Sequence, residues 1–487
     1  MNKKENTVSP GMRALAIRSF ALIGAQKVLR FFIIAIGGIF MARLLVPEDF
    51  GAFAVILFAV SLGVTFGELG LGTALIQRRD RDVTLFLGKA FLIHIIIASS
   101  FCAILVVSAN FINTLLSFKS DISGPLSWLS IILPISALRM PPAVLLERKL
   151  CFFPIVLSDT IDVLVFYSIA GTIAYIGGGV WSFVIGAIVG RFFGLFPLWL
   201  SAKWKPSFKG RWDLLFPSIK FGTFLQLNSL VTMFRDSFVP ILVAAMLGVK
   251  AVGFLNWSST VALLPLQFVR VAGRILFTTL AQFQNDPERF SKAFNQAFNR
   301  VAILVLPISL WLLVGADQIV KILYGDKWIP AIPAIRLFCL TCIFGGTANL
   351  CIQSLYSVGK AVLVLRLLLF WAVLVWLVGS TLIYLIGFNG FPIATTVASF
   401  IVALLSRRFI SPFPVRILRQ VQTPFIAGAI SSVFLWSALY LYDFDILGLV
   451  TISPILIFLY VTILLIIGGK TFRAEIWHDV VTLKKIS

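Results

Sequence analysis

Fourteen long apolar stretches divide this chain of 487 residues, and they constrain its fold more than any other feature. A helix needs about 20 apolar residues to cross the hydrocarbon core of a bilayer, and only 13% of the residues are charged. The composition therefore predicts an all-α integral membrane protein with about 14 transmembrane helices and excludes a soluble enzyme. The stretches cover residues 20–45, 51–76, 86–112, 126–146, 153–176, 180–202, 219–247, 252–277, 301–323, 332–358, 362–386, 391–405, 424–442 and 447–467.

Lysine and arginine are divided unevenly among the joints between these stretches, and the division indicates orientation. Positive charge collects on the cytoplasmic side of a membrane protein. With the N-terminus inside, most of the 41 Lys and Arg lie on inside segments, and the outside loops contain only Lys119, Lys250, Lys321 and Lys327. We therefore expect a multi-pass protein of the cytoplasmic (inner) membrane with both termini in the cytoplasm. Because topology explains the net charge of +21, no nucleic-acid partner is expected.

The chain also repeats itself weakly at an offset of 202 residues. That offset places Ala42 on Ala244, Leu45 on Leu247 and Gly51 on Gly253. It predicts two pseudo-repeated six-helix lobes, and transporters built from such repeats bind their substrate where the repeats meet. The expected organisation is an N-terminal lobe at 1–202, a basic cytoplasmic linker at 203–218, a C-terminal lobe at 219–420, and two further helices with a cytoplasmic tail at 421–487.

The linker alternates tryptophan with basic residues. Trp204 and Trp212 lie among Lys203, Lys205 and Lys209. This pattern suits a segment in the lipid headgroup layer, and an ordinary solvated linker explains it equally well.

Several cations and one glutamine lie inside the apolar stretches, where a charge costs about 2.5–3.5 kcal/mol on insertion scales. Such residues usually face a water-filled cavity or a charged partner. Spans one, seven and eight therefore look like walls of a cationic chamber, which guanidinium groups would equip to bind a diphosphate. The candidate binding residues are Lys27, Arg30, Arg139, Arg235, Gln267, Arg270 and Arg274.

Four acids at membrane depth have two possible roles. Asp159 and Asp162 are three residues apart and share a helical face, so they could carry a coupling proton or sodium ion. They could equally be ion-pair partners of Arg139 or Arg191. Because cations outnumber these acids, the set favours an anionic substrate. The candidates for ion coupling or gating are Glu68, Asp159, Asp162 and Asp236.

Catalytic and metal-binding patterns are weak. Cys339 and Cys342 form a C-x-x-C, but only His94 and His478 could supplement them as ligands. No phosphate-binding loop or nucleophile with a base is visible. We therefore expect neither an enzyme nor a cofactor or metal, and the driving force is left open between a proton, sodium and the membrane potential.

Short motifs in both halves resemble a known family. They are ARLL-x-PEDFG at residues 42–51, GELGLGTALIQR at 67–78, LPLQ at 264–267, RILF at 274–277, QNDPERF at 284–290 and GDKW at 325–328. In this order they resemble the colanic-acid-type polysaccharide exporters of the multidrug/oligosaccharidyl-lipid/polysaccharide (MOP) flippase superfamily.

The resemblance implies a bacterial flippase that moves an undecaprenyl-diphosphate-linked oligosaccharide across the cytoplasmic membrane by alternating access, for surface polysaccharide biosynthesis. Its partners would be membrane lipid and this lipid-linked oligosaccharide. It leaves open whether a polysaccharide polymerase and glycosyltransferases assemble with it.

Two other functions compete with this one. A multidrug exporter of the same superfamily captures cationic drugs, which a chamber lined by Lys27 and Arg30 would repel. A membrane scaffold without transport activity would leave the polar stripe of residues 256–274 unexplained.

Overall fold

The computed structural model describes residues 10–68, 70–77, 84–115, 121–207, 241–410, 413–442 and 444–486. Within these ranges all regular secondary structure is helical, which confirms the predicted all-α class. Contacts divide the chain into two compact units, residues 1–253 and 254–487. The lobe boundaries expected near residues 202 and 219 remain predictions, because residues 208–240 lie outside the described ranges.

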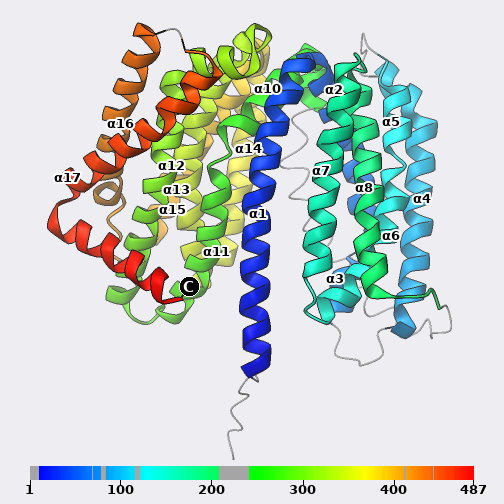
Figure 1. Cartoon of the computed structure of the whole chain (residues 1–487), viewed down its shortest axis with the longest axis horizontal. Coiled ribbons are helices and arrows are strands. Elements are labelled where there is room, and N and C mark those ends of the chain that lie inside the picture. The colour runs from blue at the N-terminus through cyan, green and yellow to red at the C-terminus, as the bar shows by residue number, and fades with distance from the viewer. Residues whose placement is uncertain are drawn as a thin grey trace, which may run out of the picture. The chain divides into compact units, whose positions relative to one another are not determined.

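The first unit is a helical bundle in which α7 packs along α8, while α6 contacts α8 and α1 contacts α7 (Figure 1). On the other side of α6, α4 packs against α6 and α2. The helices are α1 (Pro10–Leu44), α2 (Pro47–Glu68), α3 (Leu71–Gln77), α4 (Thr84–Leu115), α5 (Ser123–Leu129), α6 (Ile132–Arg148), α7 (Phe153–Tyr175), α8 (Val180–Ala202) and the start of α10 (Val249–Ala262).

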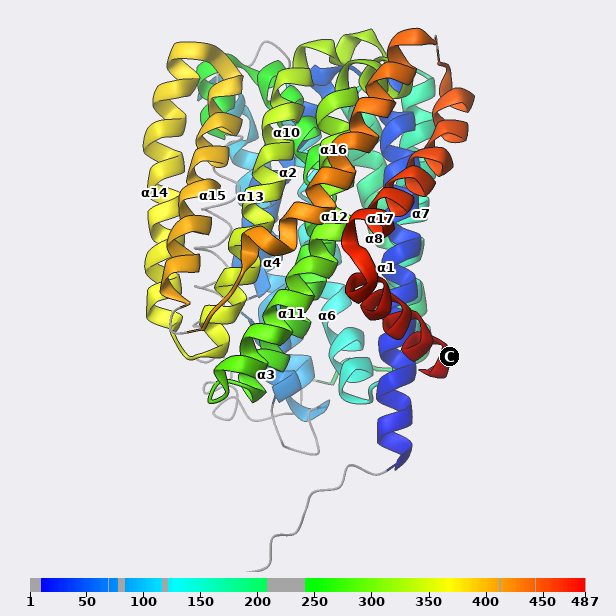
Figure 2. The ribbon, with the colours of Figure 1, turned by 90° about the vertical axis from the view of Figure 1, so that its left-hand side faces the viewer.

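The second unit is built around α12 and α13, which pack against each other, with α16 on α12 and α15 on α13. Helices α14 and α15 lie side by side in Figure 2 and are also in contact. The elements are α11 (Leu266–Gln282), α12 (Pro287–Tyr324), the 3-10 turn η1 (Asp326–Ala331), α13 (Ile332–Ser357), α14 (Ala361–Ile386), η2 (Gly387–Asn389), α15 (Gly390–Phe409), α16 (Ile417–Leu441) and α17 (Ile446–Ile486), which bends at Gly469.

Ten helices of the described ranges are long and apolar enough to cross a membrane, or eleven if the bent pair α10 and α11 is one span. One of the ten runs, residues 361–409, contains both α14 and α15. The chain is therefore a multi-pass membrane protein, as its composition predicts.

Three stretches predicted as single spans contain a break in the helix, although residues 47–76 and 123–148 each still qualify as one candidate membrane span. Residues 51–76 divide into α2 and α3, with Gly70 at a φ of 62° between them. The stretch at 126–146 divides into α5 and α6, because Pro134 has no N–H to donate to the carbonyl of Ser130. The stretch at 252–277 bends by 53° before α11, where Pro265 interrupts the hydrogen-bond ladder.

The beginning of the predicted linker is fastened to the first unit. Trp204 is buried, and its ring packs against Phe91 and Trp199 with centroids 5.8 and 5.7 Å apart. Lys203 and Lys205 on either side of it are exposed. The sequence left two possibilities for the linker, a segment in the lipid headgroup layer and a solvated linker. Neither describes Trp204, because protein covers its indole ring.

Candidate functional site

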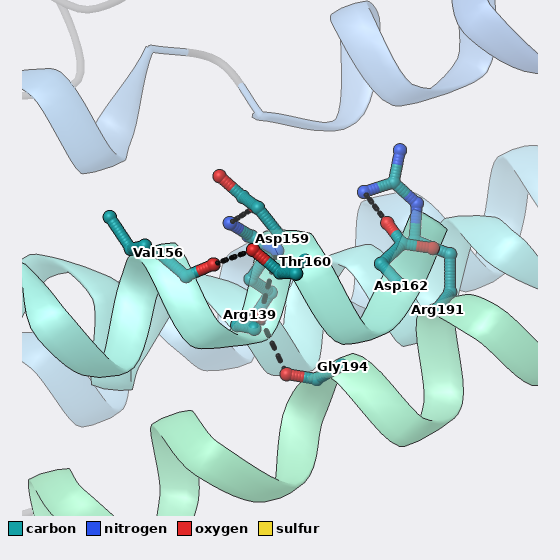
Figure 3. Close-up of polar contacts among 8 residues, drawn as sticks. Arg139, Val156, Asp159, Thr160, Asp162, Arg191 and Gly194 are labelled. Atoms are coloured by element: carbon teal, nitrogen blue, oxygen red, sulfur yellow. Dashed lines mark hydrogen bonds and ion pairs between the residues drawn. The ribbon is translucent and has the colours of Figure 1, made fainter. Parts of the chain in front are cut away.

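Helix α7 presents Asp159 to α6. The Oδ1 atom of Asp159 accepts a hydrogen bond from Arg139 Nη2 at 2.6 Å (Figure 3). The two side chains are 26% and 29% exposed, so most of this ion pair is enclosed by helices. An enclosed pair satisfies both charges, whereas either partner alone would retain its full desolvation cost.

One turn further along α7, Asp162 pairs with α8. Its Oδ2 lies 3.1 Å from Arg191 Nη1 (Figure 3). Asp162 is the more enclosed partner at 17% exposed, and Arg191 is 45% exposed. Both ion pairs that the sequence offered as an alternative to ion coupling are therefore present.

Glycines on α8 allow this arrangement. A Cβ built on Gly190 would lie 2.6 Å from the carbonyl oxygen of Asp162 and 2.9 Å from its Oδ1. One turn later, a Cβ on Gly194 would lie 3.2 Å from the carbonyl oxygen of Ser158. With Gly186, these residues follow a four-residue spacing that lets helix backbones approach closely. The close approach brings the Asp162 carboxylate against the backbone of α8.

Ser158 links the packing to the charges. Its buried hydroxyl donates to the carbonyl oxygen of Gly194 at 2.6 Å and accepts from Arg139 Nη1 at 3.2 Å. The guanidinium is thus held between a carboxylate on one side and a hydroxyl on the other.

Two further charges belong to the same group. Arg30 of α1 is close enough for its charge to act on Asp162, and Glu68 at the end of α2 is within electrostatic range of Arg139 and Arg191. We refer to the six residues as the charged cluster: Arg30, Glu68, Arg139, Asp159, Asp162 and Arg191.

The charged cluster contains three cations and three acids. The excess of cations expected at membrane depth concerns a larger set of residues and stays a prediction, because Arg235 and Asp236 lie outside the described ranges. The packing of α7 against α6 and α8 pairs Arg139 and Arg191 with aspartates of α7. Counting charges along the sequence could not reveal this pairing.

The unpaired cations of this region lie on α1. Lys27 and Arg30 are both exposed, as expected for residues sharing a helical face, and neither forms an ion pair with a described residue. Gln26 beside them is buried. These two side chains are therefore the available positive charges of this region: Arg30 belongs to the charged cluster, and Lys27 lies about one helical turn before it on α1.

The second unit carries the predicted polar stripe on α11. Gln267, Arg270 and Arg274 are all exposed, and the opposite face of the helix is buried through Val269, Gly273, Leu276 and Leu280. Arg270 and Arg274 form no ion pair within the described ranges. The stripe is therefore uncovered by the unit that carries it.

The remaining candidate residues, Arg235 and Asp236, lie outside the residues that the structure describes. Arg235 and Asp236 belong to residues 208–240, so the wall expected from span seven stays a prediction. Helices α1 and α11 belong to different compact units, and the expected chamber formed with them stays a prediction as well.

The sequence did not single out Ser158, Gly194 or one further ion pair between helices. That pair joins Arg336 of α13 to Asp317 of α12 at 2.5 Å. The spacing of Gly186, Gly190 and Gly194 was the available signal for the α7–α8 contact, whereas nothing in the local sequence pairs Arg336 with Asp317.

Three of the five cysteines belong to the second unit. Cys339, Cys342 and Cys351 are buried in α13 as free thiols. A search of the described ranges finds no group of three His, Cys, Asp or Glu side chains that could hold a metal ion.

Comparisons with known proteins give consistent matches. A family profile described as polysaccharide biosynthesis protein matches residues 40–333. The lipopolysaccharide biosynthesis protein WzxC of Escherichia coli (strain K12) is 23% identical over 356 residues, covering 72% of this chain and 69% of the relative. The succinoglycan biosynthesis transport protein ExoT of Rhizobium meliloti (strain 1021) is 25% identical over 342 residues, covering 70% and 68%.

Among solved structures, the lipid II flippase MurJ in an inward closed conformation matches with a TM-score of 0.71. The match covers 96% of this chain and 100% of that one at 17% identity. This likeness establishes a shared fold.

Proposed function

This chain belongs to the family of polysaccharide biosynthesis proteins, and from that premise we propose that it is a flippase for a lipid-linked oligosaccharide. Its lipid carrier would be undecaprenyl diphosphate, and the reaction would be transfer across the bacterial cytoplasmic membrane by alternating access. The names of the Escherichia coli and Rhizobium relatives and the fold shared with a lipid II flippase support this proposal.

The observation that carries the proposal is the pair of exposed cations Lys27 and Arg30 on α1, neither of which forms an ion pair with a described residue, whereas the other two arginines of the charged cluster are paired with aspartates. A diphosphate attracts guanidinium and ammonium groups through charge-assisted hydrogen bonds, and low-dielectric surroundings strengthen the attraction. We propose that Lys27 and Arg30 bind the diphosphate in the first unit. Gln267, Arg270 and Arg274 of α11, together with Arg235, are proposed to contact the anionic head group as the second set.

Arg139 has a different proposed role. Its guanidinium is engaged by Asp159 and Ser158, so it can bind the substrate only by exchanging one of these partners for a phosphate oxygen. A carboxylate released in this way inside the membrane is costly unless it takes up a cation. The proposed coupling set is therefore Asp159, Asp162 and Glu68, with Asp236 in the second repeat.

The experiment is transport in proteoliposomes that contain a fluorescent undecaprenyl-diphosphate oligosaccharide, with its appearance in the far leaflet as the signal. We expect the native chain to flip this lipid. The flipping rate of the double variant Lys27→Ala/Arg30→Ala should be at least tenfold lower, equivalent to about 1.4 kcal/mol of binding free energy. Arg408→Ala, which removes an exposed arginine at the end of α15, is the matched control and should retain the native rate.

The outcomes separate the competing functions. If the native chain flips nothing but exports a cationic dye, the proposal fails in favour of a drug exporter. If Arg30→Lys retains the full rate, the site acts through its general positive field and not through bidentate guanidinium binding.

A further inference from the structure

Within the first unit, α1 rests on the ring of Tyr167, which belongs to α7. A Cβ built on Gly37 of α1 would overlap Cδ1 of this ring and lie 2.5 Å from its Cγ and 2.7 Å from its Cε1. One turn further along α7, a Cβ built on Gly171 would lie 3.1 Å from Cε1 of Phe40. Each helix therefore presents a glycine to an aromatic ring of the other, and this contact fixes the height of α1 on α7.

The two contacts also place Arg30 relative to Tyr167. Residue 37 lies opposite residue 167, and residue 40 lies opposite residue 171, so α1 and α7 run in the same direction. Arg30 comes seven residues before Gly37, which is about two helical turns away on the same face of α1. The charge of Arg30 acts on both Tyr167 and Asp162, as this placement requires.

The hydroxyl of Tyr167 has no hydrogen-bond partner among the described residues, although the side chain is partly buried. Buried tyrosines usually satisfy this group. Tyr460, for example, donates to the carbonyl oxygen of Ile303 at 2.9 Å. Long side chains on a helix lean toward its N-terminus. We therefore expect the Tyr167 hydroxyl on the side of the ring that is nearer to Arg30, as a donor open to a ligand.

We propose that Tyr167 contacts the substrate, with its hydroxyl donating a hydrogen bond to an oxygen of the diphosphate that Arg30 binds. A neutral hydroxyl forms a short, charge-assisted hydrogen bond with an oxyanion and adds no further positive charge to the membrane interior. The inference rests on the proposed function, and it adds to the site a residue that carries no charge. Its ring holds α1 in place on α7, while its hydroxyl is the group offered to the ligand.

Tyr167→Phe tests the hydroxyl, because it keeps the ring against Gly37. The probe is farnesyl diphosphate, a short isoprenyl diphosphate without a sugar, and its affinity is measured on the purified full chain in detergent. We expect about tenfold weaker binding, as for one lost hydrogen bond to a charged group, with an unchanged melting temperature. The matched control is Tyr175→Phe, which alters a tyrosine at the end of α7 that is 78% exposed and should bind like the native chain.

A double-mutant cycle separates a shared phosphate contact from a change in packing. If Tyr167 and Arg30 bind the same diphosphate, Arg30→Ala/Tyr167→Phe should lose clearly less affinity than the product of the two single losses. Losses that simply multiply would overturn the shared contact, and so would native affinity in Tyr167→Phe.

The binding measurement also distinguishes this inference from the proposed function. Native affinity in Tyr167→Phe, in a chain that flips the lipid-linked oligosaccharide, would reject the role of Tyr167 alone. Weaker binding by Tyr167→Phe in a chain that flips nothing would support the tyrosine contact while rejecting the proposed transport. If the native chain does not bind farnesyl diphosphate, both the diphosphate site and the role of Tyr167 are rejected.

Discussion

At the scale of single residues, the main result is that charges which look alike in the sequence have different surroundings. Arg30 and Arg139 are both arginines at membrane depth. Arg30 is exposed and forms no ion pair within the described ranges, whereas Arg139 is held by Asp159 and Ser158. An unpaired exposed cation is available to a ligand, and a paired one first has to lose a partner.

This difference predicts the stability of the Arg139 pair. Asp159→Asn removes the charge that balances Arg139, and we expect it to lower the free energy of unfolding by about 1–3 kcal/mol. This is less than for a fully buried pair, because about a quarter of each side chain is exposed. The double variant Arg139→Gln/Asp159→Asn should recover most of the loss. Thermal unfolding in detergent, followed by tryptophan fluorescence, measures both.

The control is Glu48→Gln, which breaks the exposed pair with Lys250 and should cost no more than about 1 kcal/mol. An equal loss for Asp159→Asn and Glu48→Gln would contradict the enclosed character of the Arg139 pair.

At the scale of helices, backbone proximity places the charges. Helices α7 and α8 approach closely because Gly190 and Gly194 present no side chain toward α7. Asp162 can then lie against α8 and reach Arg191. A larger residue at either glycine would push the helices apart and lengthen the distance between the two charges.

Gly190→Ala tests this dependence. The added methyl group would collide with the backbone and carboxylate of Asp162, and overpacking of this kind costs about 1–3 kcal/mol. We expect a lower melting temperature and a reduced flipping rate. Gly38→Ala is the control, because a Cβ there meets nothing within 4 Å and alanine favours the helix over glycine. Equal melting temperatures for the two variants would show that the α7–α8 contact tolerates a side chain.

At the scale of the whole molecule, the chain is a multi-pass helical membrane protein with the fold of a known flippase. The positive-inside rule predicts its orientation, and this prediction is open to a direct test. Lys250 is predicted outside and Lys205 inside, and both side chains are exposed.

We therefore expect Lys250→Cys to react with a membrane-impermeant maleimide in intact spheroplasts, and Lys205→Cys to react only after lysis. The measurement requires a background without native cysteines, since Cys151 is exposed. The reverse labelling pattern would invert the topology.

The sequence by itself determined the helical membrane class and the family resemblance. Apolar length, charge placement and short motifs are local properties that depend little on tertiary packing. It also identified most members of the charged cluster, because a charge inside an apolar stretch is conspicuous wherever the helix lies. The sequence showed where a break such as the one at Pro265 was possible, but it could not show its form, since a proline can kink a span or end it.

Only the tertiary structure decided which charges are paired and which helices touch. Asp159 and Arg139 are 20 residues apart, and their pairing depends on how α6 and α7 pack. The contact of Gly51 with Val249 joins segments about 200 residues apart, although a weak repeat hinted at their equivalence. Pairing of this kind is set by the short distances between packed backbones, which no local pattern in the chain specifies.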